Sequence, residues 1–567
     1  MASMSATRRA FLRGVVAVLA GLAVMAAGTA GGGTPTELSC AALEGEAAET
    51  ERLIGSTADH AKFEVLEGPF ESGPEVTEAC LSCHTEAAGQ VHRSIHWTWH
   101  FDQPGSDRDL GKRNLINNRG ISIAGSYERC SSCHVGYGWS DADFDFTDES
   151  RVDCLVCHDT TGDYVKDPTG AGHPPYETVT FQGEEIEPPE LAHVAQNVGP
   201  TSRQTCGSCH LEGGAERGDL QPSLMEPPRS LDVHMAPDGA DMSCASCHEF
   251  TGHLQRVSRY RTTEPAGIGE SSGGPQDKPS CVACHGAEPH EPGVHDRLNA
   301  HSEYIACQTC HIPELARGGG ETRTLWDWSE AGRTDDAGEP VIERDEAGRV
   351  VYDGRRGAFE WAEDLIPQYR WFNGNMRYTL PEDPIDPEGG VPLNRPQGAP
   401  GAEGSRIWPF KVMHGKQPYD RVHEHLLVPQ TFGGEDEPDA YMRSLDWERA
   451  ITSGMEEARA LGQIEDATYS GDHGFVETRM YWPSNHMVAP AEASVACADC
   501  HSDGGRMSGV PGVYVPGDDG HPVIERIGWA AVLLALLGVL GHGGARYYLS
   551  RQQRREGGES STEEGTS

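Results

Sequence analysis

Cys80-Leu81-Ser82-Cys83-His84 is the first of eight pentapeptides of the form Cys-x-x-Cys-His in this chain. Two thiols at this spacing can bond to the two vinyl groups on one edge of a haem, and the adjacent imidazole can then bind the iron as its proximal ligand. The repeated motif therefore predicts eight covalently attached haem c groups. In chain order, the second to eighth motifs begin at Cys130, Cys154, Cys206, Cys244, Cys281, Cys307 and Cys497.

Sixteen of the seventeen cysteines fall inside these motifs, and only Cys40 lies outside them. Structural zinc and disulfides are alternative uses of paired cysteines, but neither needs a histidine after every second cysteine. The predicted haem-attachment residues are Cys80, Cys83, Cys130, Cys133, Cys154, Cys157, Cys206, Cys209, Cys244, Cys247, Cys281, Cys284, Cys307, Cys310, Cys497 and Cys500. The predicted proximal iron ligands are His84, His134, His158, His210, His248, His285, His311 and His501.

The composition fits a chain whose interior is filled by cofactors as much as by side chains. Glycine and proline number 69 and 37, and apolar residues make up only 37% of the 567 residues, which is poor material for a conventional core. Porphyrins would supply the missing apolar bulk. We therefore predict a mainly α fold with extensive irregular loops and few or no strands, packed around eight haems in one continuous domain over residues 56–505.

The N-terminus has the pattern of an export signal over residues 1–30, because the Arg8-Arg9 pair precedes an apolar run that ends near Ala27. The arginine pair fits a twin-arginine signal, and the basic region of a general secretory signal is the alternative. Both routes lead outside the cytoplasm. Residues 31–55 are rich in Gly, Thr and Glu and are predicted to be a flexible tether.

A second apolar segment, residues 527–549, is long enough to cross the hydrocarbon core of a membrane. Arginines follow it and favour a cytoplasmic tail over residues 550–567, and residues 506–526 are predicted to be a linker. We therefore predict a periplasmic domain that one C-terminal transmembrane helix anchors in the cytoplasmic membrane. His542 inside the segment is either a polar residue near the interface or a contact for a membrane haem or quinol.

The formal net charge of −43 argues against nucleic acid as a partner. So acidic a surface suits a cationic redox partner or a high-salt habitat. It would also repel small anions, unless the mouth of the active site is locally basic.

The histidines outside the motifs are the candidates for distal iron ligands. An electron-transfer haem takes two histidines, whereas a catalytic haem leaves one axial position open or exchangeable. Eighteen of the 26 histidines lie outside the motifs, enough for seven or eight distal ligands. The cysteine-free stretch between the seventh and eighth motifs is predicted to be partly helical, with a helix over 444–461, and to donate ligands. The preferred distal ligands are His96, His234, His253, His301 and His486, with His60, His295, His414 and His473 next.

Segments around the motifs resemble the octahaem tetrathionate reductase family of periplasmic cytochromes. The resemblance covers about residues 56–505. It implies an octahaem fold related to hydroxylamine oxidoreductase and pentahaem nitrite reductase, in which closely packed haems conduct electrons to one active-site haem. The segments are ADHAKF from Ala58, GPEVTEACLSCHTEA from Gly73, HWTWH from His96, GKRNLINN from Gly111, DCLVCHDTTG from Asp153, TSRQTCGSCH from Thr201, IACQTCHIP from Ile305, GKQPYD from Gly415 and SNHMV from Ser484.

The resemblance also implies a lysine amine as an axial ligand of the active-site iron. Nitrite reductases of the related type take this lysine from a Cys-x-x-Cys-Lys motif. Every motif here ends in His, so the lysine must come from elsewhere in the chain. Lys112 is the first candidate and Lys166 the second. A desolvated neutral amine can bind iron, whereas an exposed lysine stays protonated.

The function implied by the resemblance is reduction of a small inorganic substrate: tetrathionate first, with nitrite and hydroxylamine as competitors. Both substrate classes need positive charge for binding and a proton source near the iron. A membrane quinol dehydrogenase or a small cytochrome would supply the electrons. Two alternatives stay open: a non-catalytic electron conduit with eight bis-histidine irons, and an oxidase of hydroxylamine or a sulfur compound. Besides the two lysines, the predicted catalytic groups are Asp59, His60, Lys411, Lys416 and Arg370.

Overall fold

The structure, a computed structural model, describes one compact unit that starts at Ala58. The predicted export signal (1–30), the tether (31–55) and Cys40 lie outside the described residues. All 26 histidines and all sixteen motif cysteines lie inside them. The described residues are 58–103, 106, 108, 110–212, 219–255, 280–434, 437–519 and 521–559.

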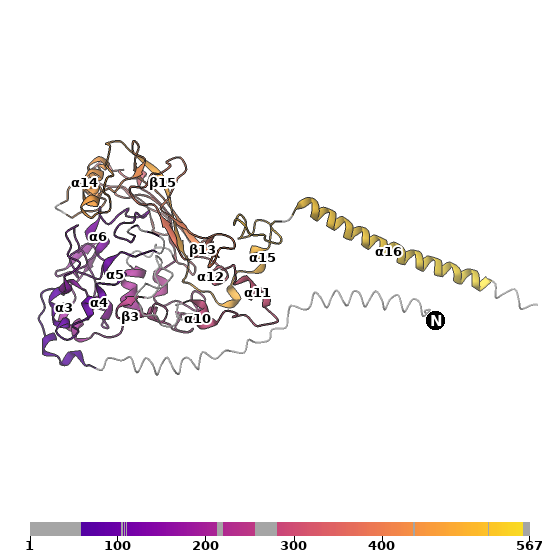
Figure 1. Ribbon diagram of the computed structural model, residues 1–567, viewed down its shortest axis with the longest axis horizontal. Helices are drawn as coiled ribbons and strands as arrows, with labels where there is room; N and C mark the ends of the chain where they lie inside the picture. Colours follow the sequence, from indigo (N-terminus) through magenta and orange to yellow (C-terminus); the bar gives the residue numbers. More distant parts are fainter. Residues whose placement is uncertain are drawn as a thin grey trace, which may run out of the picture. The chain divides into compact units, whose positions relative to one another are not determined.

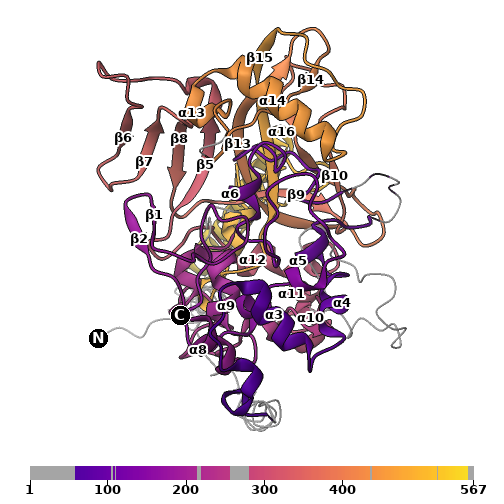
Figure 2. The ribbon, with the colours of Figure 1, turned by 90° about the vertical axis from the view of Figure 1, so that its left-hand side faces the viewer.

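Short helices carry the haem motifs, as the sequence predicts. In α10 (Cys281–His285) and α12 (Cys307–His311) the motif itself forms one helical turn. Such a turn places residues three and four positions apart on one face, so that both thiols and the imidazole can reach the same group. Figure 2 shows most of these helices gathered below the sheet. Four of the short helices contain no motif residue: α4 (Ala87–Val91), α5 (Ile95–Thr98), α8 (Leu191–Gln196) and α11 (Asp296–His301). The other helices with motif residues are α3 (Gly73–Leu81), α6 (Tyr127–Ser131), α7 (Leu155–His158), α9 (Arg203–Gly207) and α15 (Cys497–Cys500).

Irregular loops join these helices, also as predicted. They contain two small hairpins, β1 (Val179–Phe181) with β2 (Glu184–Ile186) and β3 (Phe250–Thr251) with β4 (Leu254–Gln255). One five-residue π-turn, η4 (Ser208–Glu212), carries the histidine of the fourth motif. The 3-10 turns are η1 (His60–Lys62), η2 (Glu64–Leu66), η3 (Glu149–Arg151), η5 (Pro222–Leu224), η6 (Cys244–Ser246), η8 (Trp328–Glu330) and η9 (Ala491–Ala493).

A nine-stranded sheet fills most of the stretch between the seventh and eighth motifs, so the prediction of few or no strands is wrong (Figures 1 and 2). The strand order is β11-β15-β13-β5-β8-β7-β6, and β9 and β14 also pair with β13. Its longest ladder joins β13 (Arg406–Asp420) and β15 (His473–Pro483) in antiparallel register. The other strands are β5 (Thr322–Asp327), β6 (Ile342–Arg344), β7 (Val350–Asp353), β8 (Gly357–Ala362), β9 (Gln368–Phe372), β11 (Val391–Pro392) and β14 (His425–Leu426), with β10 (Met376–Tyr378) and β12 (Asn394–Pro396) as a separate pair.

Large apolar side chains pack in the core of this sheet. Burial alternates along β15, where Val476 and Met480 face inward and Glu477 is exposed. The inward residues pack in one cluster with Trp326 and Trp328 of the neighbouring segment. Seven of the eleven tryptophans lie between the seventh and eighth motifs. The low apolar fraction of the whole chain did not predict this core, because the large apolar side chains are concentrated in one stretch.

The predicted helix over 444–461 is confirmed as α14 (Trp447–Ala460), which follows the short α13 (Tyr441–Ser444). The Asp446 side chain caps it by accepting from the backbone N–H of Arg449. Its inward face, with Ile451 and Met455, packs into the same cluster as the sheet.

The last helix, α16, spans Pro522–Glu559 and includes the predicted apolar segment 527–549. Its stretch Val523–Arg554 has a mean hydropathy of 2.0 in its most apolar window. By length and composition it could cross a membrane. The helix runs beyond the predicted segment because the polar residues after Leu549, mainly Arg and Gln, are themselves good helix formers.

Candidate haem-binding and active site

Seven of the eight motif histidines face a second histidine at a constant spacing. Two imidazoles bound to opposite sides of one metal ion, each through a bond of about 2 Å, hold their ring centroids about 6 Å apart. The structure therefore leaves room for an iron between the two rings of each pair. The pairs and their centroid distances are His84 with His60 (6.3 Å), His158 with His253 (6.3 Å), His210 with His96 (6.2 Å), His248 with His486 (6.1 Å), His285 with His234 (6.0 Å), His311 with His290 (6.3 Å) and His501 with His301 (6.2 Å).

Hydrogen bonds at Nδ1 orient several of these rings. A ring that donates from Nδ1 to an acceptor keeps Nε2 free of hydrogen, which is the form that binds a metal. The acceptors include both backbone and side-chain oxygens. These bonds run from His158 to Gly199 O (2.8 Å), from His253 to Gln90 Oε1 (2.8 Å), from His290 to Asn299 Oδ1 (3.0 Å), from His486 to Asp219 Oδ2 (3.1 Å) and from His501 to Pro516 O (3.0 Å).

All five preferred distal candidates stand opposite a motif histidine, and so does His60. His290 has the same position opposite His311, although sequence reasoning missed it. Its signal in the sequence was its place five residues after the sixth motif. His295, His414 and His473 do not stand opposite a motif histidine; His473, for example, bonds to Tyr469 Oη at 2.7 Å. The assignment of each ring to an iron stays a prediction.

The second motif differs from the other seven. The ring of His134 is fully buried, and its Nε2 lies 2.6 Å from the carbonyl oxygen of Trp97. Burial lowers the pKa of His134 to about 3, so the ring is neutral. The N–H thus points at a carbonyl where the other motif histidines face an imidazole, and the ring must turn away from Trp97 for Nε2 to bind an iron as the predicted proximal ligand. Aromatic rings enclose His134 at centroid distances of 4.9–6.2 Å, and we call them the aromatic cage: Trp97, Trp99, Trp139, Phe144 and Phe146.

Two lysines contact the backbone of this same motif. Lys166 Nζ lies 2.5 Å from the carbonyl oxygen of His134, and Lys112 Nζ lies 3.0 Å from that of Cys130. Lys112 also lies 3.5 Å from the ring centroid of Trp99, in the aromatic cage. Both lysines predicted as candidates for the active-site iron are therefore at one motif, and it is the motif that lacks a histidine pair.

Lys166 has a buried acidic partner. Its Nζ lies 3.0 Å from Asp153 Oδ2, and the carboxylate also accepts from Tyr137 Oη and Tyr164 Oη at 2.9 Å each. Burial raises the pKa of both tyrosines well above the usual value, so both hydroxyls keep their protons. His173 stacks on the Tyr137 ring and bonds to the half-exposed Tyr176.

Cations surround the aromatic cage, although the chain as a whole is strongly acidic. Lys112 lies over Trp99, while the guanidinium groups of Arg113 and Arg151 lie 5.3 Å from the ring centroids of Phe146 and Phe144. Arg151 is paired with Asp148 at 3.2 Å, however, and the loop that supplies Trp139, Phe144 and Phe146 also carries Asp141, Asp143, Asp145 and Glu149, so these carboxylates offset much of the positive charge.

The remaining predicted catalytic residues contact residues outside the second motif. Asp59 forms an exposed ion pair with Lys62 at 2.9 Å. Lys411 is buried in β13 and lies 2.5 Å from Thr322 Oγ1, and Lys416 of the same strand lies 4.0 Å from Asp327. Arg370 of β9 bonds to the carbonyl oxygen of Tyr369. Lys411, Lys416 and Arg370 thus lie in strands of the sheet, whereas Lys112 and Lys166 contact the second motif.

Cysteines of different haem motifs lie near one another in pairs, and these pairs link all eight motifs into one series. The order differs from that of the sequence: the series runs first, third, fourth, fifth, sixth, seventh, eighth, and the second motif joins it at the fourth. Closely spaced cofactors along such a series can exchange electrons. Four pairs of thiols are hydrogen-bonded, namely Cys80 with Cys154, Cys133 with Cys209, Cys206 with Cys244, and Cys281 with Cys307. Three more pairs are near enough to interact electrostatically: Cys157 with Cys206, Cys247 with Cys284, and Cys310 with Cys500.

Comparisons with known proteins match nearly the whole haem-bearing body. A family model described as bacterial cytochrome c matches residues 323–504, and one described as outer membrane cytochrome MtrC/MtrF-like, domains II/IV, matches residues 126–296. No curated protein matches the chain. The crystal structure of octahaem cytochrome c from Shewanella oneidensis is 38% identical with a TM-score of 0.70, and the match covers 81% of this chain and 98% of that one. Together with the motifs and the paired rings, these matches support eight covalently bound haem c groups.

Proposed function

The chain belongs to the octahaem cytochrome c family, and we propose that it reduces a small inorganic substrate at the haem of the second motif, Cys130–His134. The observation that carries this proposal is the difference among the motifs. Seven offer two facing imidazoles, which favours electron transfer, while His134 turns its Nε2 to the Trp97 carbonyl. When bound there by Cys130, Cys133 and His134, haem c would supply an iron that exchanges electrons and binds the substrate in exchange for a weaker ligand.

Lys166 is proposed as the axial amine at this motif. An amine must be neutral to bind a metal. The Asp153 carboxylate lies against Lys166 Nζ and is itself held by two tyrosine hydroxyls, so it fixes the position of the amine beside the motif. Lys112, which the sequence ranked first, instead lies over the indole of Trp99.

Residues around the cage are proposed to bind and protonate the substrate. Arg113 and Lys112 would attract an anion, and the cage would exclude water from the reaction. The hydroxyls of Tyr137 and Tyr164 hold protons next to Lys166. Tetrathionate is the first candidate substrate because of the family resemblance, with nitrite and hydroxylamine as competitors for the same basic site.

The eighth motif is proposed as the point where electrons enter. It stands at one end of the series of adjoining cysteines, with its second cysteine, Cys500, next to Cys310. Only a short segment separates it in sequence from α16 (Pro522–Glu559), which we propose as the membrane anchor of an extracytoplasmic protein. A quinol dehydrogenase in that membrane or a small cytochrome would be the electron donor.

Electron paramagnetic resonance of the oxidised protein tests this proposal. We expect one haem with a high-spin or amine-ligated signal that changes when nitrite, hydroxylamine or tetrathionate is added. Seven signals should be low-spin and unresponsive. Eight unresponsive bis-histidine signals would contradict the proposal and leave a non-catalytic electron conduit. Steady-state assays in both directions would then distinguish a reductase from an oxidase.

A further inference from the structure

Three potential metal ligands meet at the end of the β13–β14 hairpin, in the part of the sheet that carries no haem motif. They are Asp420, His423 and His425, and their ligand atoms all lie within 4.8 Å of one another. Asp420 and His425 are buried, whereas 44% of the His423 side chain is exposed. Two imidazoles and one carboxylate form a ligand set that binds transition metals and zinc.

A fourth donor completes the arrangement. His423 Nδ1 and His425 Nε2 both lie 3.2 Å from the carbonyl oxygen of Thr468, and His423 Nδ1 lies 3.4 Å from Asp420 Oδ2. Atoms bound at about 2 Å to one tetrahedral ion lie about 3.3 Å apart. These three separations match three of the six edges of a tetrahedron around a single ion.

The hydrogen bonds of His425 indicate that a positive centre belongs between these atoms. Its Nδ1 donates to the carbonyl oxygen of Leu426 at 2.9 Å. In the tautomer that a metal site requires, Nε2 carries no hydrogen and its lone pair points toward Thr468 O, which is also an acceptor. Two acceptors at 3.2 Å repel each other unless a cation lies between them. An Nδ1–H bonded to a backbone carbonyl is also the usual state of a metal-bound histidine.

Supporting hydrogen bonds fix the other donors. Asp420 accepts from the backbone N–H groups of Val422 and His423 at 2.8 Å each and from that of Ser470 at 2.6 Å. Glu382 Oε1 accepts from three consecutive backbone N–H groups at residues 465–467, just before Thr468. Such bonds hold the carboxylate and the carbonyl in place before an ion arrives.

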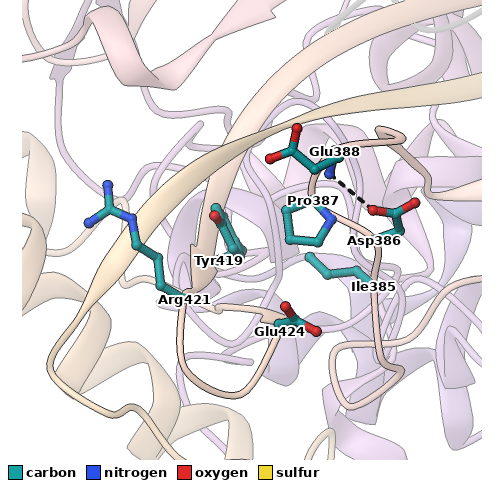
Figure 3. Close-up of a pocket in the computed structure, with 7 residues that line it drawn as sticks. All are labelled: Ile385, Asp386, Pro387, Glu388, Tyr419, Arg421 and Glu424. Carbon is teal, nitrogen blue, oxygen red and sulfur yellow. Dashed lines mark hydrogen bonds between the residues drawn. The ribbon is translucent and has the colours of Figure 1, made fainter.

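A cavity that shares the turn after β13 with the cluster is lined mainly by acidic side chains. Its volume is about 410 Å³, and Figure 3 shows its lining residues. Asp386, Glu388 and Glu424 line it, against one cation, Arg421, which is paired with Asp472 at 2.8 Å. Three carboxylates at the mouth would concentrate cations near the site.

We propose that Asp420, His423, His425 and the carbonyl of Thr468 form a zinc site that is separate from the haems. Two nitrogen and two oxygen donors suit Zn²⁺ better than Ca²⁺ or Mg²⁺, which prefer oxygen donors throughout. The ion would join the turn after β13 to the segment before β15 and so close the end of the longest ladder of the sheet. This proposal does not depend on which substrate the second motif reduces.

Zinc content of the full-length holoprotein tests the proposal. The protein in detergent is first treated with a chelator, which leaves covalent haem in place, and is then dialysed against Zn²⁺ and analysed by mass spectrometry for zinc per iron. We expect the wild type to hold one zinc per chain more than His423→Gln. Loss of one ligand should weaken zinc binding by at least about 10-fold. His193→Gln, an exposed histidine of α8, is the matched control and should bind zinc as the wild type does.

His425→Gln is the second variant, and unchanged haem absorbance in each variant shows that the protein has folded. Anomalous diffraction at the zinc edge should place the ion between His423 and Thr468. Equal zinc contents in the wild type, His423→Gln and His425→Gln would overturn the proposal. Zinc bound with an anomalous peak elsewhere would overturn it as well, because a proton on His425 would then account for the geometry.

Discussion

Lys166 Nζ lies 3.0 Å from Asp153 Oδ2, and only 9% of the lysine side chain and none of the aspartate side chain is exposed. The carboxylate thus holds the amine in a fixed position inside the protein. This pair distinguishes the second motif from the seven motifs at which two imidazoles face each other. Substitutions of Lys166 and of Asp153 test what the pair does.

Replacing Lys166 with Met should remove the amine that we propose as the axial ligand. We expect substrate reduction to fall by at least about 100-fold, since interactions made at the reacting centre are worth several kcal/mol. The amine-type resonance signal should disappear as well. The assay is reductive turnover with a chemical electron donor. Lys62→Met, at an exposed lysine, is the control and should keep full activity. If Lys112→Met loses the signal and Lys166→Met keeps it, Lys112 is the ligand.

Asp153→Asn should weaken both stability and activity. The change leaves Lys166 without its buried counter-charge, and breaking such a pair costs about 3–5 kcal/mol. The amide can still accept from a tyrosine hydroxyl, so the fold should survive with a lower midpoint of thermal unfolding. Turnover should fall because the carboxylate no longer holds the Lys166 amine in position. A variant with wild-type unfolding midpoint and wild-type turnover would contradict the proposed role of Asp153.

Asp219→Asn should raise the reduction potential of the haem at the fifth motif. Asp219 Oδ2 accepts from His486 Nδ1 at 3.1 Å, and a carboxylate in this position makes the imidazole a stronger donor to the iron. The neutral amide removes that effect. Spectroelectrochemical titration measures the shift. Gln90→Leu, at the neutral partner of His253, should shift its haem less, and an equal shift in both would count against the charge effect.

Gly454→Ala should destabilise the sheet end of the molecule. A Cβ at Gly454 would lie 2.3 Å from Gln430 N and from Val428 O, and both are backbone atoms that cannot move aside cheaply. We expect a loss of about 1–3 kcal/mol in the free energy of unfolding. Thermal unfolding of the holoprotein measures it. Gly89→Ala in α4 is the control: nothing lies within 4 Å of its Cβ, so alanine should be neutral or slightly stabilising.

A chain that ends at Asp519 should leave the membrane. Truncation there removes α16, the segment long and apolar enough to span a bilayer, and leaves all eight motifs in place. Haem should move from the membrane fraction to the soluble extracytoplasmic fraction with an unchanged spectrum. Removal of residues 560–567 alone leaves α16 intact and should leave the protein membrane-bound. Retention of the truncated chain in membranes would show that another segment anchors it.

The sequence by itself determined the cofactor and the haem-bearing part of the fold. The Cys-x-x-Cys-His spacing is a local property, because the two thiols and the imidazole lie on one helical turn, as in α12 (Cys307–His311). The helix at 444–461 was predictable for the same reason, since its apolar residues recur at helical spacing. The apolar segment 527–549 needed only its length and composition.

Only the tertiary structure decided which distant residues meet. His60 and His84 are close in sequence, but His248 faces His486 across more than two hundred residues, and no local pattern predicts such a pair. The sheet could not be predicted from the sequence for a related reason. Its strands pair across long connections, so its stability depends on non-local contacts. The exception at His134 was also invisible, because every motif reads alike in sequence. The surrounding aromatic side chains and the buried Lys166–Asp153 pair decide what that one motif can do.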